Sequence, residues 1–314
     1  MVGSEKIDTL LLERLGRVAV LHGGVSAERE VSLESGAAVI RALSEMHIDV
    51  VPVDIQDNAM QHILHAKADR AFIALHGPGG EDGKTQALLE MLNLPYTGSG
   101  VSGSSLAMDK LRSKQLLCGV GLPTPEYAIL EADTDWATTL SSLGGVVFVK
   151  PAHEGSSLGM SKVDTPEAFY EAYLKASRYD HSVIAERFIR GAEYTVSILN
   201  GSSLPSIRLQ TSNPFFDYQA KYRDESTQYF CPSGLSTSEE KHICQLALDT
   251  FSALGAAGWG RVDFMQDLDG KFYILELNTV PGLTSHSLVP MAAKAAGYNF
   301  NELVLAILRQ TLST

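Results

Sequence analysis

Two short apolar segments within residues 258–282 are joined by an Asp-Gly pair and carry three oxygen-bearing side chains. An Asp-Gly pair between two such runs strongly indicates a two-residue hairpin turn. With residues 269 and 270 as the turn, Asp263 pairs with Glu276. In the same register, Arg261 pairs with Asn278. Because side chains alternate along a strand, all four project from one face, with paired Cβ atoms about 5 Å apart. The sequence therefore predicts two opposed carboxylates on one face of a β-hairpin.

An opposed pair of carboxylates indicates a cation site, because two carboxylates this close repel each other unless positive charge lies between them. Asp263, Glu276 and Asn278 offer only oxygen ligands. Such ligands suit Mg²⁺, which binds one or two carboxylates and completes its shell with substrate phosphates. The alternative is an ordinary hairpin with a charged solvent face. The loop 279–282 contains a proline and a glycine and favours the site, because a substrate can approach a glycine backbone closely.

Composition limits the classes of partner. The net charge of −12 argues against nucleic acid and anionic membranes as general partners. No apolar run approaches the ~20 residues of a membrane span, and residues 1–17 lack the apolar core and cleavage site of a secretion signal. The 3 cysteines have no metal-ligand spacing, which fits a reduced compartment. We therefore expect a cytoplasmic protein that binds neither nucleic acid nor membranes.

Short apolar runs alternate with helical patterns in the first third of the chain. Residues 18–21, 49–53 and 71–75 read as buried strands, and a helix is expected at about 30–46. This alternation is typical of a doubly wound, Rossmann-like parallel sheet, in which ligands bind beyond the carboxyl ends of the strands. A Gly- and Ser-rich stretch at 96–105 marks a boundary. We divide this α/β chain into a leader with amphipathic helical spacing, 1–16; an amino-terminal domain, 17–104; a central unit, 105–192; and a carboxyl-terminal unit, 193–314.

The segment 76–85 is rich in glycine, follows an apolar run and ends in Lys-Thr, as a phosphate-binding P-loop does. The P-loop needs a glycine five residues before its second glycine, so that backbone N–H groups surround a phosphate. Pro78, which has no N–H, occupies that position. Glu81 and Asp82 would also repel a phosphate. We therefore reject a P-loop at this position.

A second loop rich in Gly and Ser, 151–160, follows Lys150 at the end of a strand expected at 146–150. Glycine lets a ligand approach the backbone, and successive N–H groups form anion-binding concavities. Lys150 adds a positive charge for phosphate. A plain hairpin loop is the alternative. Combined with the Mg²⁺ site predicted downstream, a nucleoside triphosphate is the more economical interpretation.

Several motifs follow one another along the chain in a fixed order. They are Gly23 to Ser32, His76 to Gly83, Met108 to Lys110, the loop after Lys150, Lys221-Tyr222, Arg261 to Asp263 and Leu275 to Gly282. In this order and spacing they resemble the motifs of the D-alanine–D-alanine ligases, within the ATP-grasp superfamily. The resemblance covers the chain from about residue 17 onward and implies the ATP-grasp fold. Departures at His22, Lys84-Thr85, Leu277 and Val280 remove none of the matching functional side chains.

The resemblance implies a ligase that makes D-alanyl-D-alanine for peptidoglycan precursor synthesis and releases ADP and phosphate. ATP would phosphorylate the carboxylate of one D-alanine, because a free carboxylate is a poor electrophile. The amine of the second D-alanine would attack the acyl phosphate. Two Mg²⁺ or Mn²⁺ ions at Asp263, Glu276 and Asn278 would neutralise charge on the phosphates. Arg261 and the Gly282 N–H would stabilise the tetrahedral oxyanion.

Matching positions also imply the contacts with ATP and with the amino acids. The ATP contacts are Lys110, Lys150 and Lys221 at the phosphates, Glu186 and the Ile189 backbone at adenine, and Glu193 at the ribose. Glu28 would bind the ammonium group of the first D-alanine; alternatively, it is a first-turn glutamate favoured by the helix dipole. Ser287 and the Leu288 N–H would bind the second carboxylate at a helix start, where Ser287 can also be an N-cap. His76 would lie near the second D-alanine, although a histidine at a strand end is also often structural.

Residues 208–232 have few aliphatic side chains and read as a long loop of the kind that covers active sites. The resemblance implies that Tyr222 latches this lid to Glu28 and Ser156 through hydrogen bonds. A tyrosine there favours the dipeptide over D-alanyl-D-lactate. The resemblance further implies a homodimer.

Two alternative functions stay open. A related ATP-grasp carboxylate–amine ligase would use another amino acid, or D-lactate, as its second substrate. A catalytically inactive nucleotide-binding regulator is the alternative from another class. The complete set of polar site residues argues against the regulator: Lys150, Arg261, Asp263, Glu276 and Asn278.

Overall fold

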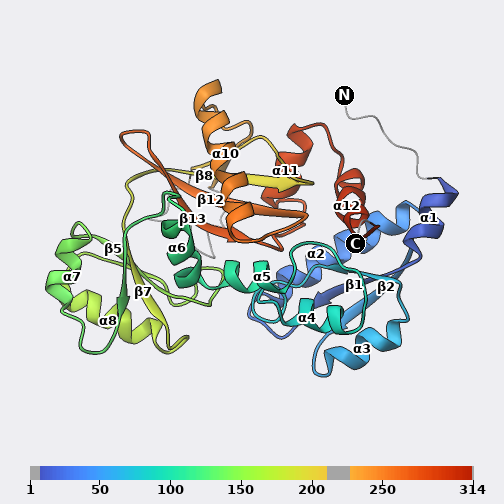
Figure 1. Cartoon of the computed structure of the whole chain (residues 1–314), viewed down its shortest axis with the longest axis horizontal. Helices are drawn as coiled ribbons and strands as arrows, with labels where there is room; N and C mark the ends of the chain where they lie inside the picture. The colour runs from blue at the N-terminus through green and yellow to red at the C-terminus, as the bar shows by residue number, and fades with distance from the viewer. Residues whose placement is uncertain (1–7, 211–226, 313–314) are drawn as a thin grey trace.

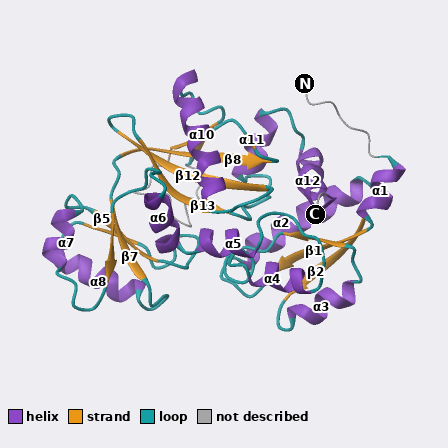
Figure 2. Cartoon of the chain, viewed as in Figure 1, coloured by secondary structure: helices purple, strands orange, loops and turns teal. Residues whose placement is uncertain are grey.

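The computed structural model describes residues 8–210 and 227–312, which form three sheets in an elongated molecule (Figure 1). The amino-terminal sheet lies at one end of the molecule and the central sheet at the other, with the carboxyl-terminal sheet between them (Figure 2). The α/β class predicted from the sequence is confirmed. Within the described part of the chain, no helix is long and apolar enough to cross a membrane.

The amino-terminal sheet is parallel, with strand order β2-β1-β3. Strands β1 and β3 are buried runs near the predicted positions, and the helix expected at about 30–46 is α2. The predicted burial of 49–53 is wrong, because β2 lies at the edge of the sheet and only its Val53 and Ile55 are buried. Both glycine-bearing loops of this domain, after residues 22 and 76, leave the carboxyl-terminal side of the sheet, where ligands bind in such folds. The elements are β1 (Arg17–Gly23), α2 (Arg29–Glu45), β2 (Asp49–Ile55), α3 (Ala59–Ala66), β3 (Arg70–Ile73) and α4 (Lys84–Met91).

Helix α1 (Thr9–Leu15), within the segment set apart as a leader, packs on this domain. Leu11 and Leu15 lie one turn apart and are buried in its core. The guanidinium of Arg70, on β3, donates hydrogen bonds to the backbone oxygens of Arg14 (2.6 Å) and Leu15. These bonds satisfy carbonyl groups that a helix end leaves without intrahelical partners. The same guanidinium donates to the backbone oxygen of Thr311 at 3.1 Å, so β3 holds both ends of the described chain.

The carboxyl-terminal helices return to the amino-terminal domain. Helix α11 (Leu288–Ala295) and helix α12 (Phe300–Arg309), which is followed by the 3₁₀ turn η1 (Gln310–Leu312), share its core. Helix α12 packs against α2, as Figure 1 shows. Residues 288–312 therefore pack on the amino-terminal domain, although they follow the carboxyl-terminal sheet in sequence.

The central unit has an antiparallel sheet in the order β4-β7-β5-β6. The strands predicted near 146–150 and 183–186 are β5 and β7. Helix α8 starts where Thr165 accepts a hydrogen bond from the Ala168 N–H and Pro166 occupies the first turn, a favourable pair of start signals. The elements are β4 (Tyr127–Leu130), α7 (Trp136–Ser142), β5 (Val147–Pro151), β6 (Ser161–Val163), α8 (Pro166–Ala176) and β7 (Val183–Arg187).

The carboxyl-terminal sheet is antiparallel in the order β11-β10-β8-β12-β13, with β9 paired to β8. Ala107 of α5 and Leu117 of α6 pack into its core, although both helices precede the central sheet in sequence. The elements are α5 (Val101–Met108), α6 (Lys110–Gly119), β8 (Gly191–Leu199), β9 (Ser202–Ser203), β10 (Ile207–Gln210), β11 (Gln228–Phe230), α10 (Thr237–Ala253), β12 (Trp259–Asp267) and β13 (Phe272–Asn278).

The hairpin β12–β13 has the predicted register at the candidate metal site. Asp263 pairs with Glu276, and Arg261 pairs with Asn278. Strand β12 also pairs along its length with β8. The site therefore lies on a strand bonded on both edges, where its backbone is held in place.

The predicted two-residue turn is wrong. The Asp267 N–H donates to the Lys271 oxygen at 2.9 Å, so the loop spans residues 268–270, and Gly270 has φ of 84°. A three-residue loop with glycine in the left-handed region is a common hairpin connection. The Asp267 side chain also accepts two backbone N–H groups of this loop. Phe264 consequently pairs with Ile274, and a β-bulge between Asp263 and Phe264 restores the predicted register at the site.

Helix α1 can be tested as part of the core. Leu15→Ala should lower the free energy of unfolding by about 2–5 kcal/mol, because it leaves a cavity at a fully buried position. Leu10→Ala removes the same atoms from an exposed position of the same helix and should change stability by less than ~0.5 kcal/mol. Urea denaturation followed by circular dichroism measures both variants. Equal effects would show that α1 does not pack on the core.

Candidate active site

Two adjoining cavities lie beside the hairpin face. The first, of about 690 Å³, lies between the amino-terminal domain and the loop 278–288. The second, of about 450 Å³, lies between the central and carboxyl-terminal sheets. Lys110, Ser156 and Glu276 line both cavities. The two cavities therefore meet at one junction, and each has the size of a small-molecule site.

Asp263 is the most tightly held residue of the hairpin face. Its carboxylate is 7% exposed and accepts two hydrogen bonds from Arg261, each 2.7 Å long. The Thr195 hydroxyl donates to it at 2.6 Å, and the Asn278 amide donates at 3.0 Å. A buried carboxylate requires such partners, because an unpaired charge in the interior is strongly destabilising. All the donors come from β12 or from its two neighbouring strands.

The predicted metal ligands lie together on this face. Glu276 is opposite Asp263, and its carboxylate lies 3.7 Å from the Lys110 ammonium group. Within the described ranges, no group of three or more His, Cys, Asp or Glu side chains is placed to hold a metal ion. The donor set is two carboxylates and the Asn278 amide. This set fits Mg²⁺, which needs only one or two carboxylates when phosphate oxygens supply further ligands.

Glu186 and Lys150, both predicted to bind ATP, form an ion pair in the second cavity. The Lys150 Nζ lies 2.7 Å from Glu186 Oε2, and the Lys114 Nζ lies 3.3 Å from Glu186 Oε1. Burial by itself would raise the pKa of Glu186, but the two ammonium groups hold that pKa below its usual value. Sequence reasoning missed Lys114. Its signal is the spacing of four residues from Lys110 on helix α6, which places both lysines on one helical side.

Ile189 and Glu193 also line the second cavity, as the predicted nucleoside contacts require. The apolar side chains of Phe148, Phe188 and Met265 lie along the same cavity. Sequence reasoning did not single out these three, because apolar residues on or beside strands are indistinguishable from ordinary core. The second cavity thus combines an apolar wall with Lys110 and Lys150.

Glu28 lies at the start of α2 and lines the first cavity. Its side chain makes no capping hydrogen bond to the first turn of α2 in the described structure. The carboxylate instead lies against the loop after β5: a Cβ atom at Gly155 would be 2.3 Å from Glu28 Oε1. A side chain at position 155 would therefore displace the Glu28 carboxylate, and the helix start directs Glu28 toward the junction of the cavities.

His76 lines the first cavity but is also fully engaged in the fold. Its Nδ1 lies 2.9 Å from the Val280 oxygen, and its Nε2 lies 3.0 Å from the Ser35 hydroxyl. Burial lowers the pKa of His76 to about 4, so the ring is neutral at pH 7. Because the Val280 oxygen can only accept, Nδ1 carries the proton and Nε2 accepts from Ser35. The ring therefore joins the amino-terminal domain to the loop after β13.

Glu81 lies in the motif at 76–83, but sequence reasoning gave it no role. Its carboxyl group accepts hydrogen bonds from the backbone N–H of Gly77 (2.7 Å) and of Val280 (3.4 Å). Burial raises the pKa of Glu81 to about 8, and the nearby Glu28 carboxylate adds to the rise. The side chain is thus largely protonated at pH 7. A carboxyl group with a displaced pKa in a cavity marks a functional-site candidate.

Ser287 precedes α11, whose first residue is Leu288. The Ser287 side chain does not cap that described helix; its hydroxyl accepts a hydrogen bond from the Thr284 N–H at 2.9 Å. The start of α11 and Gly282 both line the first cavity. The uncapped N–H groups of a helix start attract anionic groups, so this end of the cavity suits a carboxylate.

Lys221 and Tyr222 lie outside the described residues. The predicted latch from Tyr222 to Glu28 and Ser156 therefore stays a prediction. Ser156 itself lies at the junction of the two cavities and has φ of 50°. A positive φ is uncommon for a residue with a side chain, and it sets the direction of this loop at the junction.

Comparison with known proteins identifies close relatives. A D-alanine–D-alanine ligase from Saccharophagus degradans is 57% identical over 298 residues, which are 95% of this chain and 95% of the relative. D-alanine–D-alanine ligase B from Pseudomonas putida KT2440 is 52% identical over 306 residues, which are 98% of this chain and 96% of the relative. The family models for the D-ala D-ala ligase C-terminus and N-terminus match residues 116–309 and residues 17–69 and 57–99, respectively.

Solved structures extend the likeness to the fold. The D-alanine–D-alanine ligase from Bacillus anthracis complexed with ATP has a TM-score of 0.83 at 32% identity, covering 95% of this chain and 98% of that one. The VanG D-Ala:D-Ser ligase from Enterococcus faecalis has a TM-score of 0.81 at 27% identity, and the match covers 95% of this chain and 99% of that one.

The three sheets and the two cavities that meet beside the hairpin define the ATP-grasp fold, as the sequence predicted. In this arrangement the second cavity, which has room for a nucleotide, lies directly next to the polar first cavity. The chain belongs to the D-alanine–D-alanine ligase family.

The displaced pKa of Glu81 predicts a pH-dependent stability. Because the folded-state pKa is about 8 and the ordinary value is 4.5, the folded state binds the extra proton between these values, and stability falls as pH rises through that range. The Gln side chain of Glu81→Gln stays neutral at every pH. The melting temperature of this variant minus that of the wild type should therefore increase from about pH 5 to about pH 9. Glu13→Gln, at an exposed position, is the control and should show no such trend. Parallel curves for wild type and Glu81→Gln would contradict the raised pKa.

Proposed function

We propose that this chain joins two D-alanines to D-alanyl-D-alanine at the expense of ATP, for peptidoglycan precursor synthesis. The observation that supports this most directly is the junction of the two cavities. Lys110, Ser156 and Glu276 line both, so a nucleotide in one cavity would present its phosphates to an amino acid in the other. The names of the relatives at 57% and 52% identity support the choice of substrate.

In the proposal, the second cavity binds ATP. Phe148 and Ile189 offer apolar surface to the base, with Glu186 at its edge and Glu193 at the ribose. Lys150, at the end of β5, supplies positive charge toward the phosphates. The solved ligase that contains ATP and shares this fold supports a nucleotide site of this kind.

The first cavity would bind the two amino acids. Glu28 faces the junction and would pair with the ammonium group of the first D-alanine. Arg261 and the Gly282 N–H would stabilise negative charge on its carboxyl oxygens. The second D-alanine would place its carboxylate at Ser287 and the N–H of Leu288, where α11 begins. The neutral His76 ring lies at the side of this cavity and holds the loop in place.

The reaction then has two steps. A carboxylate oxygen of the first D-alanine attacks the terminal phosphorus of ATP, and ADP leaves. The amine of the second D-alanine, after losing a proton, attacks the acyl carbon. The bond from this carbon to the bridging oxygen breaks, and inorganic phosphate leaves with that oxygen. Asp263, Glu276 and Asn278 would hold two ions of Mg²⁺ or Mn²⁺. These ions would neutralise phosphate charge when bound. Arg261 bonds to Asp263 and projects from the same face, so charge stabilisation and metal binding share one carboxylate.

A coupled assay of ADP and phosphate release tests the function and separates it from the alternatives. D-alanine should stimulate release, and L-alanine should not. The likeness to a D-Ala:D-Ser ligase makes D-serine and D-lactate, each offered with D-alanine, the discriminating second substrates. We expect D-alanyl-D-alanine as the main product. Absence of D-alanine-dependent release would contradict the proposal and favour a regulator.

Isotope transfer tests the acyl phosphate. D-Alanine labelled with ¹⁸O in its carboxylate should pass one labelled oxygen to the released phosphate, because that oxygen bridges carbon and phosphorus in the intermediate. Mass spectrometry of the phosphate and of the dipeptide measures the label. Label retained wholly in the dipeptide, or found in AMP, would exclude this order of bond formation.

A charge-removing substitution tests the metal site. Asp263→Asn should weaken activation by Mg²⁺ by at least about tenfold, since metal sites lose this much even when only an outer partner is removed. Activity should recover in part at high Mg²⁺. Asp269→Asn makes the same change of charge in the exposed hairpin loop and is the control. An unchanged Mg²⁺ titration for Asp263→Asn would place the metal elsewhere.

We also propose that the enzyme is a cytoplasmic homodimer. The family resemblance supports the dimer, and the cysteines without ligand spacing or a disulfide support a reduced compartment. Size-exclusion chromatography with light scattering measures the oligomeric state directly, and a monomer at micromolar concentration would contradict the dimer.

A further inference from the structure

The loop that follows β5 is attached to the start of α6 by three consecutive residues. The Ala152 oxygen accepts a hydrogen bond from the Lys110 N–H at 3.0 Å. The Glu154 oxygen accepts one from the Lys110 side chain at 2.6 Å. Between them, His153 Nε2 lies 3.2 Å from Asp109 Oδ2. The loop that carries Ser156 and the helix that carries Lys110 are therefore joined beside the junction of the two cavities.

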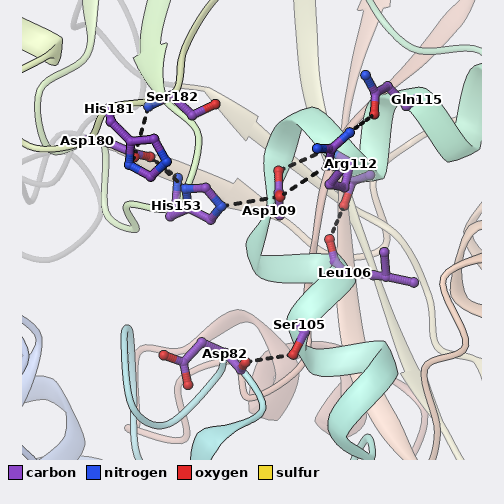
Figure 3. A network of polar contacts seen from close by, with 11 residues as sticks. Asp82, Ser105, Leu106, Asp109, Arg112, Gln115, His153, Asp180, His181 and Ser182 are labelled. Atoms are coloured by element: carbon purple, nitrogen blue, oxygen red, sulfur yellow. Dashed lines mark hydrogen bonds and ion pairs between the residues drawn. The ribbon is translucent and has the colours of Figure 1, made fainter.

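His153 also connects this loop to the segment that precedes β7. Its Nδ1 lies 2.8 Å from Asp180 Oδ2, and its backbone N–H donates to the same oxygen at 2.9 Å. Asp109 is the N-cap of α6 and accepts the Arg112 N–H at 2.9 Å. Figure 3 shows the His153 ring lying between Asp180 on one side and Asp109 on the other. One imidazole thus bridges two elements that are 71 residues apart, from Asp109 to Asp180.

The bridge places each ring nitrogen of His153 against a carboxylate oxygen. Carboxylates accept hydrogen bonds only, so both ring nitrogens of His153 must donate to satisfy both contacts. A neutral imidazole can donate to one carboxylate and turns a lone pair toward the other. Further charged groups face the bridge: Arg112, 4.0 Å from Asp109; His181, 3.2 Å from Asp180; and the neighbouring Lys110 and Glu154.

We propose that His153 is a positioning residue for the nucleotide, and that its bridge from Asp109 to Asp180 places Lys110 and Ser156 at the junction of the cavities. This inference rests on the proposed ATP site. It makes the affinity for nucleotide depend on a residue that need not touch the nucleotide. Because the ring is 44% exposed, solvent screens the bridge, and a moderate effect is expected.

Equilibrium binding tests the bridge without catalysis. Calorimetry with a non-hydrolysable ATP analogue and Mg²⁺, in the absence of D-alanine, measures Kd for the full chain. His153→Ala should raise this Kd about fivefold to tenfold, the loss expected for a partly exposed charge-assisted hydrogen bond. In the coupled assay, the KM for ATP should rise similarly, while the KM for the first D-alanine and the melting temperature stay near wild type.

His181→Ala is the matched control. His181 contacts the same Asp180 carboxylate at 3.2 Å, and its ring stacks beside that of His153, but its side chain is 93% exposed. Among the contacts of the described residues, its only ion pair is with Asp180. Its removal should leave the Kd unchanged. Equal effects of the two substitutions would overturn the proposal.

A substitution that keeps the hydrogen-bond donors distinguishes a bridge from a packing role. His153→Arg supplies a permanent cation with several donors, so its Kd should stay close to the wild-type value. A Kd for His153→Arg as high as that of His153→Ala would refute the bridge. Binding of the analogue with no D-alanine-dependent turnover would instead refute the proposed function alone.

Discussion

The buried carboxylate of Asp263 is the constraint on which the rest of the site depends. A charge in the interior must be paired, because removing its partners is strongly destabilising. Here the partners are Arg261 on the same strand, Thr195 on β8 and Asn278 on β13. The charged face is therefore assembled when β8, β12 and β13 pair in this one register. The same register places Glu276 across from Asp263, next to the lysine at the start of α6.

Neutral polar contacts join the amino-terminal domain to this face. The uncharged His76 ring bonds the Val280 oxygen, and the Ser35 hydroxyl accepts the Leu283 N–H at 3.1 Å. Both contacts hold the loop after β13, whose Gly282 lines the first cavity. A neutral ring suits this position, because an additional buried charge would require another partner. The first cavity, in which we propose that the amino acids bind, thus forms only when two domains meet.

Charged contacts have the corresponding role in the second cavity. Glu186 lies between Lys114 and Lys150, so the central sheet and helix α6 share one buried carboxylate. Helix α6 packs on the carboxyl-terminal sheet, and the central sheet contributes β5 and β7. This carboxylate therefore links the two walls of the cavity that we assign to the nucleotide. The proposed His153 bridge would strengthen the same link at its exposed edge.

Local pattern accounts for the features that sequence reasoning predicted correctly. The apolar runs of the amino-terminal domain predicted the positions of β1, β2 and β3. The predicted register of the hairpin at Asp263 is also confirmed. The turn itself was wrong by one residue, because an Asp-Gly pair also closes a three-residue loop when glycine is left-handed. The bulge after Asp263 compensated for that error, and a bulge leaves no clear signal in a single sequence.

The sequence by itself determined which chemical groups this protein has and where each lies along a strand or helix, since both follow from residue type and from periods of two and 3.6 residues. The tertiary structure alone decided which distant groups share a buried space. The second lysine at Glu186, the raised pKa of Glu81 and the bridge at His153 all depend on such neighbours. Burial and opposed charge act through distance in space, and no pattern of nearby residues encodes that distance.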